Sequence, residues 1–186
     1  MNVQALEIEH VLLITPRVFE DSRGHFFESF NQEVFKQETG ITGEFVQDNQ
    51  SLSKQTHTVR GLHFQSPPRA QGKLVRCTSG SLLDVAVDAR VGSTTYGQHV
   101  KYLLSEQNKA QLWIPAGFLH GFATLEPNTV IQYKCTDVYD ATCDGSVLWN
   151  DPELNIDWGF ESDLASLSEK DSSAETFSQF KSPFNI

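Results

Sequence analysis

Hydrophobic and polar residues alternate with a period of two along most of the chain after residue 45. Turn-forming residues such as glycine, proline, serine and aspartate interrupt this alternation about every 8 to 12 residues. Many short strands separated by turns are typical of an antiparallel sandwich or a barrel. The pattern predicts strands at 45–51, 58–65, 73–78, 81–89, 98–104, 118–125, 130–138 and 147–149.

The first 44 residues follow a more mixed pattern. Strands are predicted at 11–14 and 25–30, with a turn at 19–24 between them. A short helix is expected to begin after Asn31 and to end at Gly40, because asparagine favours helix N-termini and glycine favours helix C-termini.

The C-terminal part of the chain becomes polar and rich in serine from about residue 159. This composition predicts a tail that packs over the barrel, with its last residues frayed. A chain of 186 residues is long enough for one well-packed domain. We therefore expect a single, mainly β domain over residues 1–186, with a few short helices.

The predicted strand from Val59 to Gln65 carries several polar residues. Arginine is always charged, whereas histidine titrates near neutral pH. The combination of Arg60 and His63 in this strand indicates a site where a base acts on a substrate that is held by its anionic group. Lys73 adds a second cation. Strict alternation places Arg60, Leu62 and Phe64 on one face of the strand and Val59, Gly61, His63 and Gln65 on the other.

Composition excludes several classes of protein. The formal net charge of −10 argues against nucleic-acid and membrane-surface binding, since both need a positively charged surface. Three cysteines at unrelated spacings fit neither a disulfide framework nor a Cys-x-x-Cys metal site, and they indicate reduced thiols. The sequence shows neither a signal peptide nor an apolar run of membrane-spanning length. We therefore expect a cytoplasmic protein that binds neither nucleic acid nor membrane.

A metal centre is one interpretation of the histidines on the predicted strands. Metal sites in β-barrels usually combine several histidines with a carboxylate, often with two of the histidines close in sequence. Here His63 is followed by Phe64 and Gln65, and an amide is a poor metal ligand. The sequence therefore favours chemistry without a metal or other cofactor.

Proton transfer is the alternative chemistry. A histidine base such as His63 needs a carboxylate that orients its ring. A lysine such as Lys73 could stabilise a developing enolate, and Tyr133 or Tyr139 could act as the acid. Residue types alone leave four candidates open for the carboxylate, namely Asp48, Asp84, Asp88 and Asp171.

A series of sequence blocks runs in order from about residue 9 to about residue 172. The blocks are Arg23-Gly24-x-Phe26-x-Glu28, Gln47-Asp48-Asn49-x-Ser51, Arg60-Gly61-Leu62-His63-Phe64-Gln65, Gln71-Gly72-Lys73-Leu74-Val75-Arg76, Asp84-Val85-Ala86-Val87-Asp88, Leu112-Trp113-Ile114-Pro115-x-Gly117-Phe118-x-His120-Gly121-Phe122 and Leu148-Trp149-Asn150-Asp151. Together they resemble the dTDP-4-dehydrorhamnose 3,5-epimerase family. The resemblance implies a cupin-type jelly-roll β-barrel, a homodimer, no metal and a place in dTDP-L-rhamnose synthesis.

The resemblance also implies roles for individual residues. His63 matches the base that removes the protons at C3 and C5 of a dTDP-4-keto-6-deoxy sugar, and Asp171 matches its carboxylate partner. Lys73 matches the lysine near O4 of the enolate, with His120 in the same polar group. Tyr133 matches the acid that returns a proton from the other face of the sugar.

Substrate binding is assigned by the same resemblance. Arg23 and Arg60 match residues that hold the diphosphate, and Tyr139 matches an aromatic residue that stacks on thymine. Asp144 stands where the family commonly has glutamate, which makes its contact with the nucleotide a point to test. The remaining substrate contacts are expected at Glu28, Gln47, Asp48, Asn49, Asp144 and Lys170.

Two other functions stay open at the level of sequence. One is an epimerase acting at C3 only, or a ketoisomerase, of another dTDP-deoxysugar pathway. The other is a barrel that binds a sugar nucleotide without catalysis. Tyr133 favours double epimerisation, because inversion at C5 needs a proton donor on the far face. A binding module would need the arginines but neither His63 nor Asp171.

Overall fold

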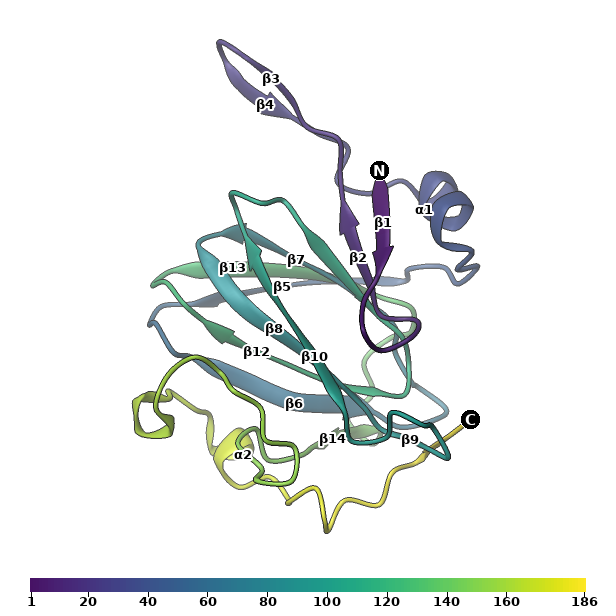
Figure 1. The fold of residues 1–186 in the computed structure, drawn as a ribbon, viewed down its shortest axis with the longest axis vertical. Helices are drawn as coiled ribbons and strands as arrows, with labels where there is room; N and C mark the ends of the chain where they lie inside the picture. Colours follow the sequence, from purple (N-terminus) through teal and green to yellow (C-terminus); the bar gives the residue numbers. More distant parts are fainter.

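Two antiparallel sheets face each other in the computed structural model, which describes residues 1–186 (Figure 1). The six-stranded sheet has the order β1 (Asn2–Ala5), β2 (Leu12–Thr15), β11 (Gln111–Ile114), β7 (Lys73–Ser79), β13 (Thr129–Cys135) and β5 (Gln47–Ser53). The five-stranded sheet has the order β10 (His99–Ser105), β8 (Ser81–Asp88), β12 (Phe118–Thr124), β6 (Val59–Gln65) and β14 (Asp144–Ser146). The all-β, jelly-roll prediction is confirmed.

Apolar side chains from both sheets fill the space between them. Because side chains alternate along a strand, every second side chain of each strand faces this core. The core cluster contains Val75 and Ile131 from the six-stranded sheet and Leu82, Ala86 and Phe122 from the five-stranded sheet. The sheets therefore enclose an apolar core, and a polar side chain between them indicates a specific structural or functional role.

The C-terminal segment covers the other face of the five-stranded sheet. Trp158, Phe177 and Phe184 pack with Leu62 and Val87 in a second apolar cluster. This explains why every residue of β12 is buried, since both faces of that strand are covered. In Figure 1 this segment, in yellow, runs past β6 and β14.

The prediction of a frayed C-terminal end is wrong. Residues Phe184–Asn185 form β15, which pairs in parallel with β9 (Arg90–Val91). Phe184 is 6% exposed. Burial of a phenylalanine side chain contributes roughly 1.5–3 kcal/mol, which is enough to keep a short terminal segment in place.

The predicted helix is confirmed as α1 (Gln32–Thr39). The side chain of Asn31 accepts hydrogen bonds from the backbone N–H groups of Glu33 and Val34. Gly40 ends the helix with a φ of 73°, a left-handed conformation that glycine adopts without strain. Two shorter helical turns, η1 (Ser162–Leu164) and α2 (Glu169–Ser172), lie in the C-terminal segment. None of these helices is long and apolar enough to cross a membrane.

Two predicted strands are misplaced. The strand predicted at 25–30 is replaced by a hairpin of β3 (Phe19–Asp21) and β4 (Gly24–Phe26). Residues 27–30 form no strand, because Phe30 packs against Phe45 beside α1. The strand predicted at 147–149 lies instead at β14, because Leu148 turns away to bond with Glu175.

Candidate active site

An irregularity in β6 sets the geometry of the site. His63 lies opposite His120 on β12, and Arg60 lies opposite Phe122. Three residue positions along β6 therefore correspond to two along β12. Such a bulge shifts the alternation of side chains. Arg60 and His63 therefore line the same cavity, and the predicted placement on opposite faces is wrong.

Glycine is required at the bulge. Gly61 has a φ of +125°, which residues with a side chain rarely adopt. A Cβ atom at this position would lie 2.6 Å from the Cα of Gly121 on the neighbouring strand. The Gly61 and Gly121 backbones thus approach each other closely, and this approach brings Arg60 and His63 to one face.

The cavity has a volume of about 440 Å³ and is lined by both sheets and the C-terminal segment. It brings together all four residues that the resemblance assigns to catalysis, with Arg60 and His120. The lining residues are Ser51, Thr58, Val59, Arg60, His63, Lys73, His120, Phe122, Tyr133, Ser166, Leu167, Ser168 and Asp171.

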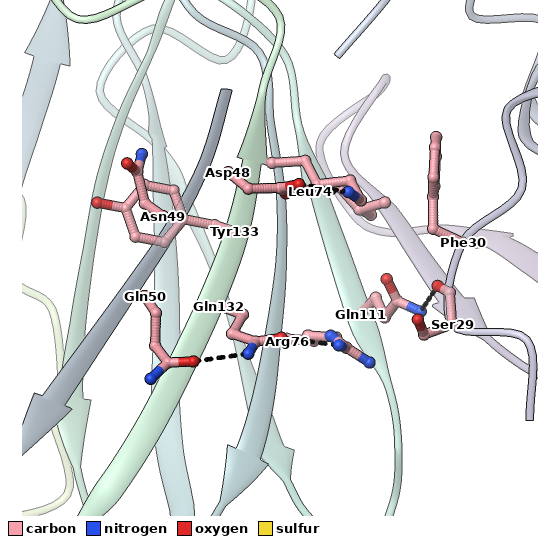
Figure 2. Close-up of a pocket in the computed structure, with 11 residues that line it drawn as sticks. Ser29, Phe30, Asp48, Asn49, Gln50, Leu74, Arg76, Gln111, Gln132 and Tyr133 are labelled. Carbon is pink, nitrogen blue, oxygen red and sulfur yellow. Dashed lines mark hydrogen bonds and ion pairs between the residues drawn. The ribbon is translucent and has the colours of Figure 1, made fainter. Parts of the chain in front are cut away.

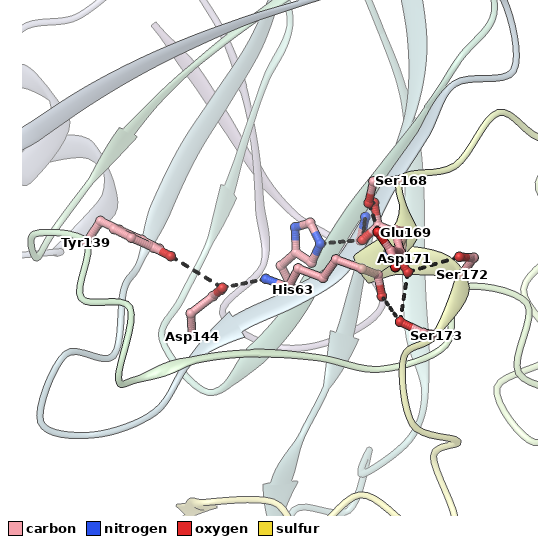
Figure 3. Close-up of polar contacts among 10 residues, drawn as sticks. His63, Tyr139, Asp144, Ser168, Glu169, Asp171, Ser172 and Ser173 are labelled. Carbon is pink, nitrogen blue, oxygen red and sulfur yellow. Dashed lines mark hydrogen bonds and ion pairs between the residues drawn. The ribbon is translucent and has the colours of Figure 1, made fainter.

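His63 is paired with Asp171, which α2 carries. The ring Nε2 lies 2.5 Å from Asp171 Oδ1, and the hydroxyl of Ser168 donates to Asp171 Oδ2 at 2.7 Å (Figure 3). Burial raises the pKa of Asp171, but the hydrogen bonds from His63 and Ser168 outweigh it and lower that pKa below its usual value. Asp171 is therefore ionised, and Nδ1 is the nitrogen of His63 left to accept a proton.

A second histidine–aspartate pair lies beside the first. His120 Nε2 is 2.7 Å from Asp84 Oδ1, and both residues are buried. The other oxygen, Asp84 Oδ2, has no hydrogen-bond partner. Burial lowers the pKa of His120, an effect that Asp84 opposes, and burial also lowers the pKa of Lys73.

Of the four carboxylates left open by residue type, the structure gives each a different partner. Asp171 contacts His63, Asp84 contacts His120, Asp88 accepts from Arg90 Nη2 at 2.7 Å, and Asp48 accepts from Lys134 at 2.9 Å. Only Asp171 lies against His63 within the cavity.

Tyr133 faces the cavity from the wall opposite His63. It lies on β13 in the six-stranded sheet, whereas His63 lies on β6 in the five-stranded sheet. Burial raises the pKa of Tyr133, so its phenol stays protonated at neutral pH. The two side chains thus combine a proton acceptor on one wall with a proton donor on the other.

A polar group that does not itself line the cavity reaches its rim through Lys170, the sequence neighbour of Asp171. The backbone N–H of Tyr139 donates to Gln47 Oε1 at 2.9 Å, and Gln47 Nε2 donates to Asn49 Oδ1 at 3.1 Å. The Tyr139 hydroxyl donates to Asp144 Oδ2 at 3.5 Å, and Lys170 donates to the same oxygen at 2.5 Å (Figure 3). Tyr139 is 57% exposed, so its ring is free to stack on a ligand.

Three of the predicted substrate contacts lie away from the cavity. Asp48 lies at an exposed position of β5 and lines a second hollow of about 480 Å³ with Gln50 and Gln132, which shares only Tyr133 with the cavity (Figure 2). Arg23 lies at the tip of the β3–β4 hairpin, and Glu28 follows that hairpin. The chain's own fold does not bring these side chains to His63.

Ser51 is a cavity residue that the sequence reasoning did not assign. Its hydroxyl is buried and makes no hydrogen bond. A period of two along β5 would have placed it on the same face as Gln47 and Asn49.

No group of three or more histidine, cysteine, aspartate or glutamate side chains is placed to hold a metal ion.

Comparison with known proteins gives consistent matches over nearly the whole chain. The dTDP-4-dehydrorhamnose 3,5-epimerase family model matches residues 5–179. The dTDP-4-dehydrorhamnose 3,5-epimerase of Sinorhizobium fredii NGR234 is 56% identical over 173 residues, 93% of this chain and 88% of that protein. The enzyme of the same name from Salmonella typhimurium LT2 is 51% identical over 179 residues, 96% of this chain and 97% of that protein.

A solved structure shows the same similarity. The dTDP-6-deoxy-D-glucose-3,5-epimerase of Legionella pneumophila Philadelphia 1, in complex with dTDP-4-keto-L-rhamnose, is 43% identical and superposes with a TM-score of 0.93. The match covers 97% of this chain and 94% of that one.

Proposed function

We propose that this chain, which belongs to the dTDP-4-dehydrorhamnose 3,5-epimerase family, uses His63 as the base for both inversions of its sugar. The chain is an isomerase that inverts C3 and C5 of dTDP-4-dehydro-6-deoxy-D-glucose in dTDP-L-rhamnose synthesis. The contact of 2.5 Å between His63 and Asp171, across one cavity from Tyr133, is the observation that carries the residue assignment.

The chemistry follows from the position of the ketone. C3 and C5 are both adjacent to the C4 carbonyl, which acidifies the proton on each carbon. His63 takes one of these protons, and the electron pair moves toward O4 to form an enolate. Lys73, with His120 beside it, stabilises the charge on O4. A proton returned to the same carbon from the opposite face then inverts the centre, and Tyr133 is the proposed donor for the inversion at C5.

Arg60 is proposed to hold the diphosphate at the mouth of the cavity. Its guanidinium donates to Ser53 Oγ and to the Leu52 carbonyl, both at 3.3 Å, and Arg60 remains exposed. Guanidinium groups bind phosphate oxygens in a two-point geometry. Tyr139 at the rim then lies where it can stack on the nucleotide base, which a diphosphate joins to the sugar.

The proposed function predicts where deuterium enters the sugar. We expect proton NMR in deuterated water, with chelator-treated protein and dTDP-4-keto-6-deoxyglucose, to show deuterium at both C3 and C5. Exchange at C3 alone would indicate a C3-only epimerase. An absence of exchange with intact dTDP binding would indicate a binding barrel.

We also propose that two chains form a homodimer in which each β3–β4 hairpin reaches the partner's cavity. The hairpin extends away from the barrel (Figure 1). Phe26 at its base is 71% exposed, and Arg23 at its tip bonds only to Asp21 of the same hairpin. An exposed aromatic arm that carries a predicted diphosphate ligand is more stable when a second copy covers it.

The dimer proposal predicts complementation between two inactive variants. In a mixed dimer of Arg23→Ala and His63→Ala chains, one cavity has its own His63 and receives Arg23 from the other chain. Random pairing makes half the dimers mixed, each with one intact site of two, so co-expression should restore about a quarter of wild-type activity.

The complementation experiment has a direct control. Each variant expressed alone should stay inactive, and sedimentation velocity should show dimers in every sample. If the mixture is no more active than the mean of the two variants, Arg23 acts within its own chain or not at all.

A further inference from the structure

The turn α2 brings Asp171 to His63 from the C-terminal segment. A single helical turn is not stable by itself. Ser168 shapes it, because its hydroxyl accepts from the Asp171 backbone N–H at 3.1 Å and donates to the Asp171 carboxylate. These bonds are internal to the segment, so the alignment of Asp171 with His63 depends on what ties the turn to the barrel.

Two side chains of α2 reach the barrel strands. Asp171 contacts His63 and the backbone N–H of Gly61, both on β6. Lys170 donates to Asp144 Oδ2 at 2.5 Å, and Asp144 lies on β14, the neighbour of β6 in the sheet. Backbone bonds hold the flanking residues Ser166 and Glu175 to the barrel, and the side chains of α2 add two attachments on adjacent strands, one of which is the contact with His63 itself.

We infer that Lys170 and Asp144 are positioning residues, whose ion pair fixes the α2 turn so that Asp171 stays aligned with His63. This role differs from the substrate contacts that the resemblance assigns to the same two residues. The kinetic part of the inference rests on the proposed function, whereas the structural part does not.

The same ion pair connects the base to the nucleotide side of the site. The hydroxyl of Tyr139, the residue proposed to stack on thymine, lies 3.5 Å from the Asp144 oxygen that Lys170 contacts (Figure 3). A continuous set of contacts therefore runs from Tyr139 through Asp144 and Lys170 to Asp171.

The size of the expected effect follows from exposure. The side chains of Lys170 and Asp144 are 45% and 22% exposed, so water screens their attraction. Ion pairs with this degree of exposure shift an equilibrium by about 1.4- to fivefold. The effect on the alignment of Asp171 should fall in this range.

Hydrogen exchange on the ligand-free protein tests the structural part. In Asp144→Asn and Lys170→Met, the amides of residues 169–173 should exchange about two- to fivefold faster than in the wild type. The conservative variant Asp144→Glu should restore the wild-type rate, because a glutamate carboxylate still reaches the flexible lysine. Lys101→Met, which removes another partly exposed ion pair with Asp157, should leave these amides unchanged.

Kinetics and nucleotide binding test the consequence. The same two variants should lower kcat by about two- to fivefold with an unchanged Kd for dTDP, and the double variant should be no worse than either single one. Unchanged exchange in residues 169–173 would overturn the inference. A raised Kd for dTDP with unchanged kcat would instead assign both residues to substrate contact. A failure of the proposed epimerase chemistry would leave the exchange result standing.

Discussion

Replacing His63 by alanine is expected to lower kcat by about 100- to 10,000-fold, the usual contribution of a positioned general base. Deuterium should enter the sugar at neither C3 nor C5, because His63 is the proposed base for both carbons. The neighbouring His120 is not expected to substitute, because it is only 6% exposed and burial lowers its pKa, which makes it a weaker base. The measurements are steady-state kinetics and site-resolved NMR exchange.

Binding controls separate loss of catalysis from loss of structure. The Kd of dTDP should be unchanged in His63→Ala, since Arg60 and Tyr139 are proposed to bind the nucleotide part. His99→Ala, on β10 and outside the cavity, should keep full activity. Turnover that survives the loss of His63 would falsify its assignment as the base.

Replacing Tyr133 by phenylalanine removes one hydroxyl group and should separate the two inversions. We expect exchange at C3 to persist, while inversion at C5 slows by about 100-fold or more, the effect of losing a general acid. The physical reason is position, because Tyr133 lies on the cavity wall opposite His63 and keeps its proton at neutral pH. The ratio of C5 to C3 deuteration, followed by NMR, is the quantity to measure.

Tyr139→Phe is the matched control for this experiment. It also removes one hydroxyl, but from a residue at the rim whose ring can still stack on a base. Its C5 to C3 ratio should equal that of the wild type. An unchanged ratio in Tyr133→Phe, or an equal loss at both carbons, would give Tyr133 a different role.

Regular features of this fold are readable from sequence because they depend on local patterns. Alternation located most of the strands, and the pair Asn31 and Gly40 marked both ends of α1. The register between two strands is not a local property. The bulge at Gly61 arises where β6 meets β12, so alternation alone placed Arg60 and His63 on opposite faces, against the observed geometry.

The partner of His63 also could not be found from a local pattern. Residue types left four aspartates open, and only the resemblance selected Asp171. The contact joins residues 108 positions apart, which no periodicity connects. By contrast, the orientation of Asp48 follows directly from the period of two along β5. This period places its side chain on the face opposite to that of Asn49 and outside the cavity.

The C-terminal segment has a consequence for how this enzyme is made in the cell. Domains begin to fold while the ribosome is still adding residues. The strands of the barrel leave the ribosome first, but the outer face of β6, β8 and β12 stays uncovered until the residues from Trp149 to Phe184 follow. A nascent or prematurely released chain would thus expose an apolar sheet face, which chaperones and proteases recognise. The same chain would carry His63 without Asp171, the carboxylate proposed to orient it, until α2 has been added.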